Sequence, residues 1–238
     1  MKSKYFTVEV KPRIPNVAAG QHAAFADGDI LFDWFAFDIP KGPAKLIGVS
    51  SDIRPKGDSG ATPNEFPYEL FFAKSRNNGT DPTSLGTVNS AVTVPFFLPN
   101  QILTFVEVVA GDFADHLDSV AFAHTVPLAG TIFAGEAKPE QGTHVGFDRY
   151  YVAGMAGGSL DFSSILKINA GTLDGSSFTT DEIAATTTAD TAVSKALGTI
   201  KSMTATNITL ETTTENAILN NDFIYNIAPL TIRLHFEK

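Results

Sequence analysis

Leu230-Thr231-Ile232-Arg233-Leu234-His235-Phe236-Glu237 is the stretch in which apolar and polar side chains alternate most strictly. Successive side chains of a β-strand point to opposite faces, so every second residue from Leu230 to Phe236 shares one face. The stretch therefore predicts a strand with one buried side and one polar side. His235 lies on the polar side.

Strand-like patterns recur along the chain. Ala44–Ile53 predicts a strand that places Ile47 and Val49 on one face together with Ile53. Ile30–Phe37 is apolar on both faces, with Trp34 inside it, which predicts a central position in a sandwich. Further strands are expected over Tyr68–Phe72, Ile102–Val109, Val120–Val126, Val145–Val152, Leu160–Ala170, Met203–Thr212 and Phe223–Ile227.

Turn residues separate these segments. The chain holds 19 glycines and 13 prolines, and turn signals stand at 40–43, 55–58, 77–79 and 174–175. Many short strands with such turns between them predict an all-β fold, an antiparallel β-sandwich or jelly roll. At most one short helix is expected, over Ile183–Leu197, where Thr179 and Glu182 match a capping box. The threonines within it disfavour a helix.

Composition changes along the chain. Threonine is concentrated at and after Thr172, whereas most phenylalanines lie at or before Phe162. We therefore expect one β-sandwich domain over 1–238, with residues 130–216 as a large Thr-rich insertion. Two domains divided near Gly130 are the alternative. Residues 1–15 are expected to form either an ordinary first strand or an N-terminal arm that reaches a neighbouring subunit.

Charge and composition exclude several classes of function. The 238 residues include no cysteine, which excludes disulfides, thiolate metal sites and cysteine catalysis. The formal net charge of −9 disfavours nucleic acid as a partner, because such binding requires neutralised phosphates. No apolar run approaches the roughly 20 residues of a membrane-spanning helix, and no signal peptide is recognisable. The sequence thus predicts a protein made in the host cytoplasm without a membrane partner.

No catalytic, cofactor-binding or metal-binding residue is predicted. The five histidines (His22, His116, His124, His144 and His235) show none of the short spacings typical of zinc ligands. Asp112, Asp115 and Asp118 lack the glycine and terminal glutamate of a calcium loop, so an acidic loop is expected there. The glycine-rich segment 154–159 lacks the lysine of a phosphate-binding loop and predicts a turn. Tyr150 and Tyr151 should point to opposite faces of a strand, which leaves one of them exposed as a candidate interface residue.

Several short segments, taken in order, resemble capsid-associated β-sandwich proteins of tailed bacteriophages. The segments are Gly28-Asp29-Ile30, Ile39-Pro40-Lys41-Gly42, Leu46-Ile47-Gly48-Val49, Tyr68-Glu69-Leu70-Phe71-Phe72, Asn89-Ser90-Ala91, Ile224-Tyr225-Asn226-Ile227-Ala228 and Leu230-Thr231-Ile232-Arg233-Leu234. They cover a minor part of the chain, and the long Thr-rich region departs from the compact members of the group.

This resemblance implies a non-enzymatic structural protein of the virion that decorates or cements the outside of an icosahedral head. Its implied partners are the major capsid protein or other virion proteins, and further copies of itself in a homotrimer. The principal alternative is a receptor- or glycan-binding module of a phage tail or fibre. A carbohydrate-active enzyme and a cellular adhesion protein are further alternatives on the same fold.

Overall fold

The structure is a computed structural model that describes residues 4–14, 25–53, 66–75, 81–93, 102–109, 113–117, 120–126, 130–134, 145–158, 168–169, 182–186, 194–204, 207–214, 216 and 223–238. The turn signals at 55–58, 77–79 and 174–175 lie outside these residues, as does most of the strand expected over 160–170.

All regular secondary structure in the described part of the chain is β-strand. The strands are β1 (Tyr5–Val10), β2 (Ile30–Pro40), β3 (Ala44–Ile53), β4 (Tyr68–Lys74), β5 (Ile102–Val108), β6 (Phe113–Leu117), β7 (Val120–Thr125), β8 (Ile132–Phe133), β9 (Phe147–Ala156), β10 (Ile168–Asn169), β11 (Glu182–Thr186), β12 (Ser194–Met203), β13 (Ile208–Leu210), β14 (Phe223–Asn226) and β15 (Leu230–Glu237). The all-β prediction is therefore confirmed.

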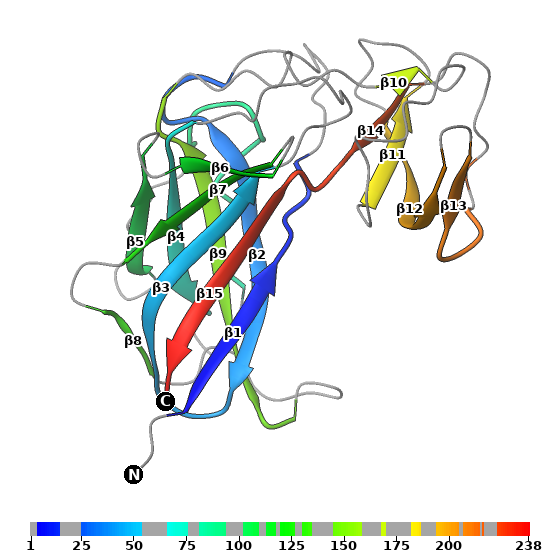
Figure 1. The fold of residues 1–238 in the computed structure, drawn as a ribbon. Coiled ribbons are helices and arrows are strands. Elements are labelled where there is room, and N and C mark those ends of the chain that lie inside the picture. The colour runs from blue at the N-terminus through cyan, green and yellow to red at the C-terminus, as the bar shows by residue number, and fades with distance from the viewer. Residues whose placement is uncertain are drawn as a thin grey trace.

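Two antiparallel sheets face each other as a β-sandwich (Figure 1). The first sheet has the strand order β1-β15-β3-β7-β6, with β8 paired to β3, and the second has the order β2-β9-β4-β5. A third sheet, β10-β14-β11-β12-β13, lies beside the sandwich, and its strand β14 leads directly into β15 (Figure 1).

The strand β15 lies between the first strand of the chain and β3. It pairs antiparallel with β1 from Tyr5↔Glu237 to Val10↔Ile232, and with β3 from Leu230↔Ile53 to Glu237↔Lys45. Its apolar residues Leu230, Ile232, Leu234 and Phe236 are all buried, as their alternation predicts.

The core between the two sheets is built around aromatic rings. Phe133 of β8 is fully buried, and its ring lies edge-on against Phe236 at 5.3 Å and against Tyr150 at 5.1 Å between centroids. Edge-to-face contacts of this kind add to the free energy of apolar burial. The short strand β8 therefore fixes the two sheets to each other.

A bulge in β3 places Ile47 on the opposite face of the sheet from Val49, contrary to the prediction. His235 pairs with Gly48, but Phe236 pairs with Leu46, so Ile47 is an extra residue on its strand. Such an insertion reverses the alternation of side chains. Leu46 and Val49 are both buried, whereas Ile47 lies on the outer face of the sheet.

The expectation that Ile30–Phe37 is a central strand is wrong. The strand β2 lies at the end of its sheet, beside β9. Its outer face is apolar because residues 81–93 pack there: Leu85 and Val92 cluster with Ile30 and Trp34. The Asp33 carboxylate accepts a hydrogen bond from the backbone N–H of Leu85, and Trp34 donates to the carbonyl of Thr83.

The helix expected over Ile183–Leu197 is also wrong. Glu182–Thr186 and Ser194–Met203 are strands β11 and β12, which pair antiparallel with each other. Pairing across a sheet outweighs the helical propensity of the alanines here, and the threonines suit strands better. Met203–Thr212 is likewise not one strand: β12 and β13 form a hairpin, in which the N–H of Thr204 donates to the carbonyl of Asn207.

Residues 130–216 do not form a single insertion. The strand β8 belongs to the first sheet, and β9 is an inner strand of the second, with Tyr150 and Val152 fully buried. The elaboration consists instead of β10 to β14, so it begins after β9 rather than at residue 130. The N-terminal segment Tyr5–Val10 pairs with β15 along its whole length, as a first strand of the same chain.

Substitutions at two consecutive residues of β8 test how much the aromatic core contributes to stability. Phe133→Ala is expected to lower the free energy of unfolding by about 3–5 kcal/mol, because it removes a ring from a packed interior. Ile132→Ala is the matched control: Ile132 is 61% exposed, so its truncation should cost less than about 0.5 kcal/mol. Denaturant unfolding of the two variants measures the difference, and equal costs would contradict this account of the core.

Candidate functional site

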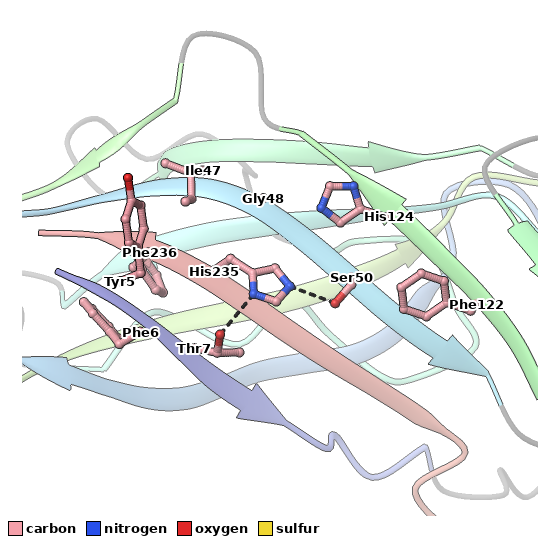
Figure 2. Close-up of a pocket in the computed structure, with 10 residues that line it drawn as sticks. All are labelled: Tyr5, Phe6, Thr7, Ile47, Gly48, Ser50, Phe122, His124, His235 and Phe236. Atoms are coloured by element: carbon pink, nitrogen blue, oxygen red, sulfur yellow. Dashed lines mark hydrogen bonds between the residues drawn. The ribbon is translucent and has the colours of Figure 1, made fainter. Parts of the chain in front are cut away.

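A shallow groove of about 540 Å³ lies on the outer face of the first sheet. Figure 2 shows the residues that line it, which come from β1, β3, β7 and β15. They are Tyr5, Phe6, Thr7, Ile47, Gly48, Ser50, Phe122, His124, His235 and Phe236. The ring of Phe236 is fully buried in the core, so the groove itself combines the exposed ring of Tyr5 with two imidazoles and the hydroxyls of Thr7 and Ser50.

His235 is held at both ring nitrogens. Its Nδ1 lies 3.0 Å from the Thr7 hydroxyl oxygen, and its Nε2 lies 2.8 Å from the Ser50 hydroxyl oxygen (Figure 2). Register places Thr7 directly opposite His235 on β1, and Ser50 lies two residues beyond Gly48, the partner of His235 on β3. Because hydroxyls both donate and accept, the pair fixes the ring plane for either neutral tautomer.

Gly48 separates His235 from a second imidazole. The rings of His124 and His235 lie 6.2 Å apart between centroids. A methyl group at Gly48 would lie 3.2 Å from His124 Nε2 and 3.7 Å from His235 Cδ2. The missing side chain thus leaves a gap that both rings border.

Burial and neighbouring groups disfavour protonation of His235. Burial lowers the pKa of the His235 imidazole, and electrostatic interactions with His124 and Arg233 lower it further. Arg233 lies next to the histidine on the same face, where its Nε is 3.3 Å from Glu9 and its Nη1 is 2.5 Å from Asp52. These two carboxylates balance the guanidinium, so the polar face carries a row of paired charges beside the groove.

The Ser50–His235 distance is that of a nucleophile and its general base. Two features distinguish it from a catalytic triad. The Thr7 hydroxyl stands where a carboxylate would orient the base and stabilise its charged form. Ser50 is also only 5% exposed. The arrangement is better suited to holding the imidazole in a fixed orientation than to transferring a proton.

Metal ligation by acidic clusters receives no support from the described residues. They contain no group of three or more His, Asp or Glu side chains placed to hold a metal ion. Asp115 and His116 lie in strand β6 rather than in the expected acidic loop, while Asp112 and Asp118 fall outside the described residues. His22 and His144 also fall outside them.

The prediction that Tyr150 or Tyr151 is exposed is wrong, since both are buried. Tyr150 points into the core, where burial raises its pKa to about 12. Tyr151 lies on the opposite face, and its hydroxyl donates a 2.5 Å hydrogen bond to Asp81, the first residue of the segment that covers β2. Nearby, Arg149 pairs with Asp38 at 2.8 Å.

The turn expected at 154–159 begins later, because β9 continues through Ala156. Gly154 serves close packing within the sheet. A Cβ there would lie 2.2 Å from the ring of Phe32 on the adjacent strand β2. The glycine thus admits an aromatic ring over the strand, a common role for glycine inside a sheet.

The groove residues were not identified from the sequence. Thr7, Ser50, His124 and His235 come from four strands that are far apart in the chain, and nothing in their local spacing relates them. The available signal was the alternation in 230–237, which places His235 on the polar face. It does not reveal which strands flank β15.

Comparisons with known proteins assign no family. No family model matches the chain, and a search of curated proteins finds no match either. Among solved structures, the infectious bursal disease virus VP2 subviral particle aligns with 99% of this chain at 7% identity and a TM-score of 0.17. The chain spans 41% of the length of that protein. A likeness this weak carries no conclusion about function.

No helix in the described part of the chain has the length and apolar character needed to cross a bilayer.

Replacing His235 tests how the polar face is held together. His235→Ala should lower the free energy of unfolding by about 1–3 kcal/mol, because it removes two hydrogen bonds and leaves the buried Ser50 hydroxyl unpaired. Ser50→Ala/His235→Ala should be no less stable than His235→Ala, since the unpaired hydroxyl is then absent. Denaturant unfolding measures both variants. A double variant clearly less stable than the single one would contradict this explanation.

Proposed function

We propose that the protein is a non-enzymatic structural component of a tailed-phage virion, which decorates or cements the outside of the head. The proposal rests on the positions in the fold of the segments that resemble phage proteins. They form the turn into β2, the β2–β3 turn, β3, β4 and the β14–β15 region, together with part of the segment that covers β2. The resemblance thus involves strands of both sheets of the sandwich.

Electrostatics support an outer position. A formal net charge of −9 repels packaged DNA, so a place on the inner surface of the shell is unfavourable. The outer surface imposes no such cost.

Exposed apolar side chains support a role in assembly. Phe105 on the end strand β5 is 52% exposed and stacks on the buried Phe71 at 6.2 Å. Val126, Ile132 and Val145 are also largely exposed. End strands with apolar side chains pair readily with other chains. The proposed partners are the major capsid protein and further copies of this chain, arranged as a homotrimer.

The groove favours one alternative, a receptor- or glycan-binding module of a tail or fibre. Tyr5 is 66% exposed at its rim, beside the hydroxyl of Thr7. An exposed aromatic ring next to hydrogen-bonding groups suits a sugar ring, which has an apolar face and polar edges.

Copy number per particle distinguishes these functions. Quantitative mass spectrometry of density-purified phage particles should give a ratio to the major capsid protein of about one third or one, as closed symmetry of a shell component requires. A far lower ratio would favour the tail or fibre module. Absence of the chain from particles would overturn both assignments, and copies of the capsid protein in the same preparation serve as the internal standard.

A further inference from the structure

The imidazole of His235 ties the N-terminal strand to the rest of the first sheet. The strand β1 lies at the end of that sheet, and β15 is its only backbone partner among the described strands. Lys4 and Lys238 exchange both of their backbone hydrogen bonds. Bonded and unbonded pairs alternate along an antiparallel ladder, so Thr7 and His235, three positions further, form an unbonded pair. Side chains approach closely in such a pair, which places the Thr7 hydroxyl 3.0 Å from His235 Nδ1.

We propose that His235, with His124 beside it, is an acid-sensitive latch for β1. The neutral ring favours the closed sheet, and protonation of His235 favours an arrangement in which β1 separates from β15. A change of pH thus acts on the attachment of the N-terminal strand.

The two hydroxyls around His235 do not by themselves oppose protonation. Ser50 lies 2.8 Å from Nε2 and Thr7 lies 3.0 Å from Nδ1, and a hydroxyl oxygen can accept a hydrogen bond as well as donate one. Both hydroxyls can therefore accept from an imidazolium ring. The cost of the positive charge comes instead from burial and from other charged groups.

Burial is the larger of these costs. It is the main cause of the lowered pKa of His235. The buried Ser50 closes one edge of the ring, and β1 covers the other edge at Nδ1. Separation of β1 admits water to Nδ1, which makes the charged form less costly. Opening of β1 and protonation of the ring therefore favour each other.

Repulsion from positive groups on the same face is the second cost. The ring of His124 on β7 lies 6.2 Å from that of His235 between centroids, as Figure 2 shows for their arrangement. Arg233 lies two residues away on β15. Both groups lower the pKa of His235 further. Lys45 of β3 is farther along the sheet, since its backbone partner is Glu237.

The carboxylates that face the ring are already engaged. Glu9 on β1 and Asp52 on β3 pair with the guanidinium of Arg233. Glu237 on β15 accepts a hydrogen bond from the Tyr5 hydroxyl at 3.4 Å. These carboxylates therefore offset the other polar groups of the face rather than a charge on the imidazole.

The latch is closed near neutral pH and weakens in acid. Because the pKa of His235 is lowered in the folded chain, the open form binds more protons below the ordinary value of 6.5. The contribution of the neutral ring to stability is fully present above that pH. It is lost as the pH falls through the pKa of the folded chain. This behaviour does not depend on where the protein lies in a virion.

Hydrogen exchange of the full chain at pH 7.5 and pH 5.5 tests the proposal. The amides of Phe6 and Val8, which face β15 in the ladder, should lose protection by about threefold or more at pH 5.5, after correction for the intrinsic pH dependence of exchange. Amides of β4 and β9 in the second sheet serve as the internal reference. His235→Gln keeps hydrogen-bonding groups but cannot take up a proton, so its β1 protection should not change with pH. His116→Gln, which alters a histidine of β6, is the matched control and should respond as the wild type does.

A second variant and a direct titration keep the proposal falsifiable if His235→Gln does not fold. His124→Gln should reduce the response without abolishing it, because the burial of His235 remains. Nuclear magnetic resonance titration of the wild-type ring should give a pKa for His235 below its ordinary value. Equal loss of β1 protection in the wild type and His235→Gln, unchanged protection of the wild type at pH 5.5, or a His235 pKa at or above the ordinary value would overturn the proposal.

Discussion

The fold depends on the insertion of β15 between β1 and β3. Lys4 and Lys238 exchange backbone hydrogen bonds at one end of this pairing, so segments from opposite ends of the sequence form adjacent strands. A shift of one residue would turn Arg233 and His235 into the core and Leu234 and Phe236 toward solvent. The apolar alternation of β15 thus determines the register of three strands, and with it which polar side chains meet on the outer face.

The bulge at Ile47 links the core to the groove. Without the extra residue, the strict alternation of β3 would place Leu46 and Gly48 on the same face, opposite Val49. With it, Leu46 and Val49 both enter the core, while Gly48 faces outward between the two imidazoles. One irregularity in backbone pairing therefore improves burial and opens the gap beside His235 at the same position.

The sequence predicted the bounds of individual strands better than it predicted which strands lie beside each other. The bounds expected for Ala44–Ile53 match β3, because turns and alternation are local signals. The position of β2 and the burial of Tyr151 were predicted wrongly, since both depend on residues 81–93 folding over the outer face. The strands at Glu182–Thr186 and Ser194–Met203 were missed because a partner strand, rather than local propensity, decides their conformation. The groove could not be predicted from the sequence for the same reason, because its residues come from four separate strands.

The groove and the exposed ring of Phe105 lie on different sheets of the sandwich. The imidazole pair and its hydroxyls lie on the outer face of the first sheet, whereas Phe105 belongs to β5 at the end of the second sheet. Substitutions at sites that share no contacts usually have additive effects. A change at Gly48 should therefore leave the surface of β5 intact, and a change at Phe105 should leave the groove intact. The packed core between the two sheets keeps both surfaces rigid.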